Sequence, residues 1–267
     1  MRPLFIDSGG ARLAALSHPA FLAGFALAGV YASLIELFRT GANRWLALLL
    51  ANVTILLLTG ARAPATYGLA VLALTLTFVP SPAFPRSRRL GLVLGLAACL
   101  PAVLLLAGNL TGLRLFNAVS NYAGDLSGRD ELWPAFQKVA AASPWFGWGL
   151  GAGNTIIPPT SQVAETLHTW AAHDEYLRME VEGGQIGRAI LILLFALWCW
   201  RNSAPLQSSD RAIIRLVFIA FACHAITDNV LISTSASVLF TFISAVFARG
   251  RLEIESLLAP EPNRTFA

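Results

Sequence analysis

Charged residues are scarce in this sequence, and lysine is almost absent. Charged residues make up 13% of the 267 positions, against roughly 25% in an ordinary soluble domain, and Lys138 is the only lysine. Hydrophobic residues make up 56%, the mean hydropathy is +0.63, and the apolar residues form long runs without amphipathic spacing. This composition excludes a soluble globule. The net charge of +4 comes from arginines that lie mostly in short gaps between apolar runs. Such scattered arginines do not form a basic nucleic-acid-binding surface.

Paired cysteines and a cleavable leader are also missing. Cys99, Cys199 and Cys223 all fall inside apolar runs without paired spacing, which excludes a disulfide framework and a cysteine zinc site. The first residues include Asp7 and Arg12 and contain no compact apolar stretch, so no signal peptide is expected. We therefore expect the helices themselves to insert the protein into a membrane.

Seven apolar runs predict membrane-spanning helices, since a span needs about 20 residues at a rise of about 1.5 Å each. The candidates are Phe21–Phe38, Trp45–Thr59, Thr66–Val79, Leu90–Leu110, Gln185–Trp200, Ile213–Leu231 and Thr234–Ala248. The third, fifth and seventh runs are short, so tilted or partly re-entrant helices are expected there. The predicted fold class is all-α integral membrane, with one membrane domain over residues 1–267.

Arginines in the connecting segments predict the orientation, because cytoplasmic loops accumulate Lys and Arg near helix ends. If the Pro80–Arg89 loop is cytoplasmic, three other arginine-bearing segments share its side: Arg39–Arg44, Arg201–Arg211 and Arg249–Arg251. The long loop 111–184 between the fourth and fifth spans then lies outside, together with the short loop carrying Arg62. The amino terminus, with Arg2 and Arg12, also falls outside. A further upstream helix removes that misfit, so a short or N-terminally truncated chain is expected.

The outer loop concentrates the polar residues of the chain. Eight of the fifteen acidic residues lie between Asp125 and Glu182, and a connection of about 70 residues far exceeds the usual length, which indicates a functional unit. Residues from Ser127 onward predict a capped helix whose apolar face rests on the membrane surface or on the helix bundle. Glycine occupies every second position from 147 to 153. This spacing fails the dinucleotide pattern and indicates either close approach to a ligand or helix, or loop flexibility alone.

The run from His173 to Gly187 carries a family resemblance. His173-Asp-Glu-Tyr-Leu followed by Glu182-Gly-Gly-Gln-Ile-Gly187 resembles the His-Asn-x-Tyr-Leu and Glu-x-Gly-x-x-Gly patterns of the bacterial O-antigen ligase and O-antigen polymerase superfamily, with Asp174 in place of asparagine. Leu58-Thr-Gly-Ala-Arg62 is similar to the family's Thr-x-Ser-Arg element, with alanine in place of serine. Arg129 with Trp133, then Pro144 and the alternating glycines, follow the family's order. The matches cover about residues 45–250, but fewer spans precede the loop than is usual in the family.

The resemblance implies a membrane glycosyltransferase of the bacterial inner membrane that acts at the periplasmic face without a metal or other cofactor. Members pass a glycan from undecaprenyl pyrophosphate to a hydroxyl of lipid A-core or of another glycan chain. Such a reaction needs a base for the acceptor hydroxyl and fixed cations for the developing pyrophosphate charge. The expected partners are these two substrates and the membrane lipids, with no nucleic acid.

Outer-side residues supply both functions. His173 is the expected general base, because an imidazole accepts protons near neutral pH; the alternative is an exposed loop histidine. Arg62 and Arg129 are expected to grip pyrophosphate, because a guanidinium stays charged and bonds two phosphate oxygens at once. Arg62 is otherwise an interface anchor and Arg129 a solvated helix-start residue. Arg188 either adds to the cationic patch or extends to the interface.

The remaining site candidates have weaker patterns. Asp174 and Glu175 either orient His173 and hold a sugar hydroxyl or are solvated acids, and Tyr176 either stacks on sugar or is an interface aromatic. No metal site is expected, because His168 and His173 are five positions apart and miss the spacing that places two ligands on one helical face. His224 and Asp228, four apart in the sixth span, either line the acceptor path or bond neighbouring helices.

Three other functions remain open at this point. A polymerase differs from a ligase only in its acceptor, which no residue reports. A truncated relative without activity fits the small number of spans. A polysaccharide transporter fits less well, because the polar residues gather in the outer loop and no pair of broken helices with repeat symmetry appears.

Overall fold

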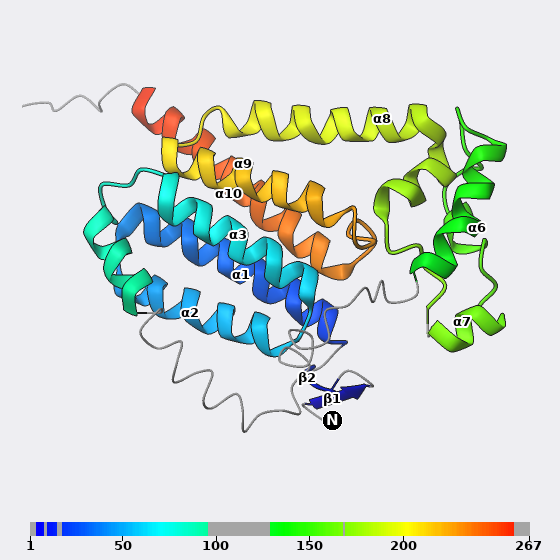
Figure 1. Cartoon of the computed structure of the whole chain (residues 1–267). Coiled ribbons are helices and arrows are strands. Elements are labelled where there is room, and N and C mark those ends of the chain that lie inside the picture. Colours follow the sequence, from blue (N-terminus) through cyan, green and yellow to red (C-terminus); the bar gives the residue numbers. More distant parts are fainter. Residues whose placement is uncertain (1–3, 8–9, 15–17, 96–128, 168, 259–267) are drawn as a thin grey trace, which may run out of the picture.

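The computed structural model describes residues 4–7, 10–14, 18–95, 129–167 and 169–258, and this part of the chain is nearly all helical (Figure 1). Helix is also present at residues 86–95. The elements are β1 Leu4–Asp7, β2 Gly10–Leu13, α1 Pro19–Thr40, α2 Asn43–Leu58, α3 Arg62–Phe78, α6 Arg129–Ala142, the 3-10 helix η1 Ala152–Asn154, α7 Gln162–Leu167, α8 Glu175–Ser203, α9 Ser208–His224 and α10 Thr234–Leu258. The all-α expectation therefore holds apart from the short β1–β2 hairpin, which the sequence analysis did not predict.

Three helices within the described ranges, α1, α8 and α10, are long and apolar enough to cross a membrane. Helices α2 and α3 lie at the second and third predicted spans with only 16 and 17 residues. The predicted seven spans are thus not confirmed, and most of Leu90–Leu110 lies outside the described residues. The sixth prediction was also too long. Helix α9 ends at His224, and residues 225–233 form turns in which the Asp228 side chain bonds the backbone N–H of Asn229.

Helix α1 lies at the centre of a bundle, where it contacts α2, α3, α9 and α10. Its buried residues form the main apolar core with side chains from those helices. Small residues allow the close approach: a Cβ on Gly24 would lie 2.2 Å from the Cβ of Ser235 on α10. Helix α8 runs along the outside of this bundle and contacts α9 (Figure 1).

One end of the bundle, which we call the arginine end, is closed by ion pairs. The buried Asp210 carboxylate at the start of α9 accepts bonds from Arg39 at 2.8 Å and from Arg249 at 2.9 Å. The Arg88 guanidinium donates to the Gly41 carbonyl at 2.8 Å, which brings the loop after α3 to the same end. The four arginine-bearing segments, predicted to share one side of the membrane, therefore lie at one end of the bundle.

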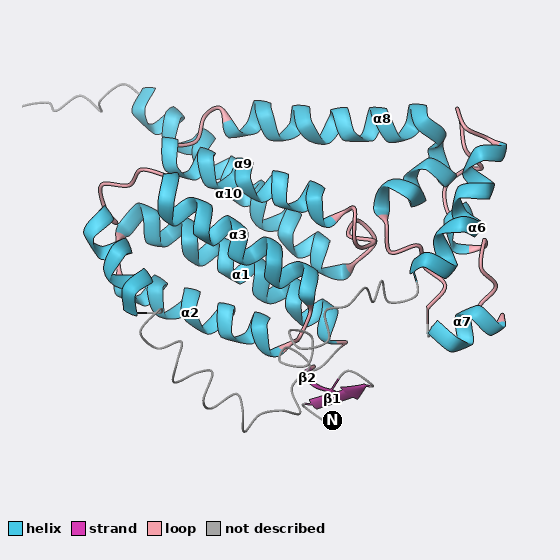
Figure 2. Ribbon diagram, in the orientation of Figure 1, coloured by secondary structure: helices cyan, strands magenta, loops and turns pink. Residues whose placement is uncertain are grey.

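Helices α6 and α7, η1 and the first turns of α8 form a separate outer unit beyond the opposite end (Figure 2). Leu132, Phe136 and Ala140 of α6 are buried against Leu177 and Val181 of α8. The predicted apolar face of α6 thus packs on a helix, which was one of the two expectations. This packing makes the first turns of α8 part of the outer unit, while the rest of α8 runs along the bundle.

Candidate functional site

The site begins at His173, whose backbone conformation is unusual. Its φ is +49°, and it is the one non-glycine residue with positive φ among the described positions. A left-handed conformation costs an L-residue roughly 1–2 kcal/mol, and such strain tends to persist where surrounding contacts hold it for a function. The two residues that follow His173 are held by such contacts. Asp174 caps α8 by accepting a bond from the Leu177 N–H at 3.0 Å, and Glu175 N–H donates to the Ala225 carbonyl at 2.8 Å.

Both ring nitrogens of His173 have partners. Nδ1 lies 3.1 Å from Oδ1 of Asp228, and Nε2 lies 3.0 Å from the hydroxyl oxygen of Thr169. An ionised carboxylate only accepts, so a neutral His173 ring carries its proton on Nδ1 and presents Nε2 as the acceptor of the Thr169 hydroxyl. An acid thus fixes one ring nitrogen and a hydroxyl meets the other, which is the geometry that general-base chemistry requires.

Asp228 is a partner that the sequence pattern did not assign to His173. Burial alone raises the pKa of this carboxyl, but the hydrogen bond from His173 and the nearby imidazoles outweigh it and hold the pKa below its ordinary value. The side chains of His173 and Asp228 are 33% and 36% exposed, so the pair is accessible from outside the protein. The available signal was the run Thr227-Asp228-Asn229 at the end of an apolar segment, which marks a loop rather than a span.

A second histidine connects this pair to the bundle. His224 Nε2 lies 3.9 Å from Oδ2 of Asp228, and its ring centroid is 5.4 Å from that of Tyr67 on α3. The Tyr67 hydroxyl donates to the Cys223 carbonyl at 3.0 Å. We call this end of the bundle, with His173, His224 and Asp228, the histidine end.

Arg62 lies at the histidine end as the first residue of α3. It precedes Tyr67 by five residues, which places its backbone about 7.5 Å beyond Tyr67 along the helix axis. Arg12 lies on this side as well, because its Nε donates at 2.8 Å to the carbonyl of Thr59 in the α2–α3 corner. Arg62 therefore comes from a helix that contacts His224 through Tyr67, and Arg12 from a strand that reaches the start of that helix.

The other sequence-predicted residues are held by protein partners. Arg188 pairs with Glu180, Glu175 binds Arg178 and accepts from the Leu231 N–H at 3.3 Å, and the Tyr176 hydroxyl donates to the Ala222 carbonyl at 2.9 Å. Arg129 begins α6, but its side chain and all of His168 lie outside the described residues. Asp228, Thr169 and His224 form one connected group with His173.

Two of the four alternating glycines, Gly147 and Gly153, make close contact with α8, whereas Gly149 and Gly151 have nothing within 4 Å of an added Cβ. Helix α8 has a kink at Gly184, whose φ is 62°. A Cβ on Gly184 would lie 2.2 Å from the Trp145 carbonyl carbon, and a Cβ on Gly147 would lie 2.5 Å from the Glu182 carbonyl carbon. The loop after α6 therefore rests directly against the kink, which was one of the alternatives for the glycine pattern.

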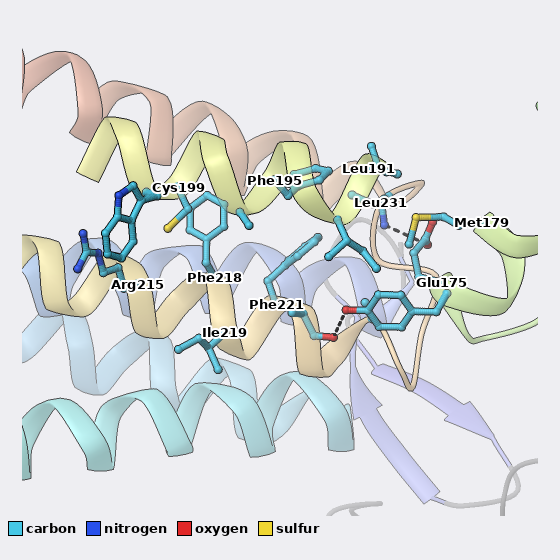
Figure 3. Close-up of a pocket in the computed structure, with 16 residues that line it drawn as sticks. Glu175, Met179, Leu191, Phe195, Cys199, Arg215, Phe218, Ile219, Phe221 and Leu231 are labelled. Atoms are coloured by element: carbon cyan, nitrogen blue, oxygen red, sulfur yellow. Dashed lines mark hydrogen bonds between the residues drawn. The ribbon is translucent and has the colours of Figure 1, made fainter. Parts of the chain in front are cut away.

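An apolar cavity of about 410 Å³ lies between α8 and α9 (Figure 3). It extends from Glu175 and Met179 at the histidine end to Cys199 and Arg215 toward the arginine end, with Phe195, Phe218 and Phe221 between them. Among the described residues, no group of three or more His, Cys, Asp or Glu side chains is placed to hold a metal ion.

Comparison with known proteins identifies the family. A search of curated proteins finds no match. The family model described as O-antigen ligase matches residues 45–192, more than half of the chain, and includes Arg62, His173 and the kink of α8. The members are membrane glycosyltransferase-like ligases and polymerases, which act on lipid-linked glycans and acceptors in general. The chain belongs to the O-antigen ligase family.

Proposed function

We propose that this protein transfers a glycan from a polyprenyl pyrophosphate, undecaprenyl pyrophosphate in bacteria, to an acceptor hydroxyl. The observation that carries the proposal is the Asp228–His173–Thr169 alignment at the open end of a bundle whose other end is closed by ion pairs. Family membership supports the reaction class, and the acceptor is either lipid A-core, as in a ligase, or a growing glycan, as in a polymerase.

In the proposed reaction, His173 Nε2 accepts the proton of the acceptor hydroxyl while that oxygen attacks the anomeric carbon. The acceptor hydroxyl takes the position that the Thr169 hydroxyl holds, 3.0 Å from Nε2. The bond from the anomeric carbon to the pyrophosphate oxygen breaks, and the electron pair leaves with the pyrophosphate. Asp228 is a positioning residue, because it keeps the proton on Nδ1 and stabilises the imidazolium that forms.

Arginine side chains supply the positive charge for the leaving group in this proposal. Arg62 is the principal candidate, because it begins α3 next to the histidines, and Arg129 at the start of α6 is the second. Guanidinium groups stay charged and bond phosphate oxygens in pairs, so the reaction as proposed requires no metal ion. Arg188, Asp174, Glu175 and Tyr176 hold the surrounding backbone and helices through the bonds described above.

The proposed location is the bacterial inner membrane with the histidine end toward the periplasm. The arginine end then faces the cytoplasm, as arginine-rich loops generally do. The loop 111–184 is periplasmic in this arrangement, and the site meets substrates that have already crossed the membrane.

The test is transfer in proteoliposomes from undecaprenyl-pyrophosphate glycan to lipid A-core or to free glycan acceptor, with EDTA present. We expect product with the wild-type chain, loss of product with Arg62→Ala, and normal product with Arg251→Ala, a matched arginine change at the arginine end. Asp228→Asn is expected to lower the rate by about tenfold to a hundredfold, the value of one hydrogen bond to a charged group. Well-folded wild-type protein that forms no product with either acceptor would overturn the proposal, and the acceptor used separates ligase from polymerase.

A further inference from the structure

The outer unit exposes one apolar surface that its own core does not use. Trp145, Phe146, Trp148 and Leu150 are 60%, 77%, 57% and 97% exposed, and we call these four residues the aromatic loop. The segment 143–154 that holds them contains no charged residue. Exposed apolar clusters of this kind mark interaction surfaces. The apolar face of α6, which was expected to rest on the membrane surface or on the helix bundle, is buried against the first turns of α8.

Hydrogen bonds fix the position of the aromatic loop along α8. The N–H of Gln185 donates to the Pro144 carbonyl at 2.8 Å, and the N–H of Ile186 donates to the Trp145 carbonyl at 3.3 Å. The uncharged run of α8 begins at Ala189, three residues beyond Ile186 and about 4.5 Å along the helix axis. The loop therefore lies at the level where the apolar part of a membrane-spanning helix begins.

The aromatic loop is also held rigidly. The backbone N–H of Trp148 donates to the Val181 carbonyl at 2.9 Å, and its indole Nε1–H donates to the Val139 carbonyl at 2.9 Å. Because the only polar atom of this ring already has a protein partner, the ring offers carbon surface. Phe146 and Leu150, the most exposed of the four side chains, have no polar atoms at all. Such a surface fits hydrocarbon better than a sugar or a polar protein partner.

We propose that the aromatic loop inserts into the bilayer at the membrane–water interface of the histidine end. Its surface continues onto α8, where Ile186 and Ile190 are 41% and 52% exposed at the start of the spanning part. Tryptophan concentrates at this depth in membrane proteins. The anchored loop holds the outer unit on the bilayer surface and thereby sets the height of His173 relative to the lipid head groups.

The test measures depth in the membrane and does not depend on the transfer reaction. A single cysteine is introduced by Phe146→Cys or Leu150→Cys in a full chain with Cys99, Cys199 and Cys223 changed to alanine, and is labelled with the fluorophore NBD. The matched control is Thr166→Cys, an exposed position on α7 in the same unit; Figure 1 draws α7 well apart from the long arm of α8 that follows the kink. The protein is placed in vesicles of phosphatidylethanolamine and phosphatidylglycerol.

We expect lipids with a doxyl group near the acyl carbonyl to quench the labels at 146 and 150 several-fold more strongly than the label at 166. Aqueous iodide should show the reverse order. Labels at 146 and 150 that iodide quenches as strongly as the control would overturn the proposal. Labels shielded from both quenchers would also overturn it, because a protein surface and not lipid then covers the loop.

Discussion

The two ends of the helix bundle use charged residues in opposite ways. At the arginine end, the fully buried Asp210 is shared by Arg39 and Arg249, which also pair with Glu253 and Glu36, and these ion pairs join α1, α9 and α10. At the histidine end, His173 and Asp228 are each about one-third exposed, and the Nε2 of His173 meets only a hydroxyl. Charged side chains that pair with one another stabilise the fold. Charged side chains that stay accessible and are oriented by a single partner are available for chemistry.

The largest expected effect comes from removing the proposed base. His173→Asn keeps a residue that tolerates positive φ but removes the imidazole, so transfer should fall by about 10²–10⁴-fold. The thermal unfolding temperature should stay close to that of the wild type. The measurements are turnover and unfolding in the same detergent, with His18→Asn, which keeps the cap of α1, as the control. A large fall in unfolding temperature would show that His173 is needed for the fold instead.

A substitution at the arginine end should lower the stability of the protein rather than its transfer rate. Asp210→Asn leaves Arg39 and Arg249 without their shared buried anion, and breaking such a pair lowers the free energy of unfolding by about 3 kcal/mol. Denaturation of the purified protein measures the loss. Per folded molecule, transfer should be normal, and a selective loss of turnover without destabilisation would remove the distinction between the two ends.

The contact between the outer unit and α8 should be broken by one methyl group. Gly184→Ala places a Cβ 2.2 Å from a backbone carbon of Trp145 at a φ of 62°, and backbone cannot move away as a flexible side chain does. We expect a loss of about 2 kcal/mol in stability, measured by denaturation, with faster proteolysis in residues 129–167.

Gly187→Ala is the matched control, because nothing lies within 4 Å of its added Cβ. Equal destabilisation by the two substitutions would show that the loop does not rest on the kink in the described way.

The smallest expected effects are on the pH dependence of stability, which should differ between Asp174 and Asp228. The pKa of Asp228 is lowered in the fold, so its charge stabilises the protein above pH about 4, and this contribution is lost as the pH falls through the lowered value. Burial raises the pKa of Asp174 against the bonds from the α8 backbone, so stability falls as the pH rises from about 4 to the raised value.

As the pH rises from about 3 to about 6, the unfolding temperature of Asp228→Asn should fall relative to the wild type. That of Asp174→Asn should rise relative to the wild type over the same range. Above this pH range, Asp174→Asn should be slightly more stable than the wild type. The variant loses the buried charge but keeps the helix cap, because asparagine caps a helix as well as aspartate does. Shifts of the same sign would contradict the assigned environments.

Local patterns predicted much of this architecture and left out its long-range contacts. Apolar runs located the helices at α1, α2, α3, α8 and α10, because hydrophobicity and length are properties of the segment itself. The four arginine-bearing segments were grouped correctly because alternation across a membrane constrains them together. The pairing of His173 with Asp228 was missed, since the two residues are 55 positions apart and only the turns after α9 bring them together.

The alternating glycines show a different limit of sequence reasoning. Their spacing indicated close backbone approach, but the partner was either a ligand or a helix. Only the contacts of Gly147 and Gly184 decide between these alternatives. The end of α9 was placed too late for a related reason, because the apolar residues Val230, Leu231 and Ile232 continue the hydrophobic pattern beyond Asp228 although the chain has already turned.

The kink at Gly184 also creates a second helix start within α8, and the loop after α6 covers it. It makes Gln185 the start of a new helical arm, and a helix start normally offers free N–H groups and the positive end of a dipole to phosphate. Here the N–H groups of Gln185 and Ile186 already donate to the carbonyls of Pro144 and Trp145. Since these two backbone donors are occupied, the pyrophosphate recognition that we propose relies on side chains, in particular on the arginine beside the histidines.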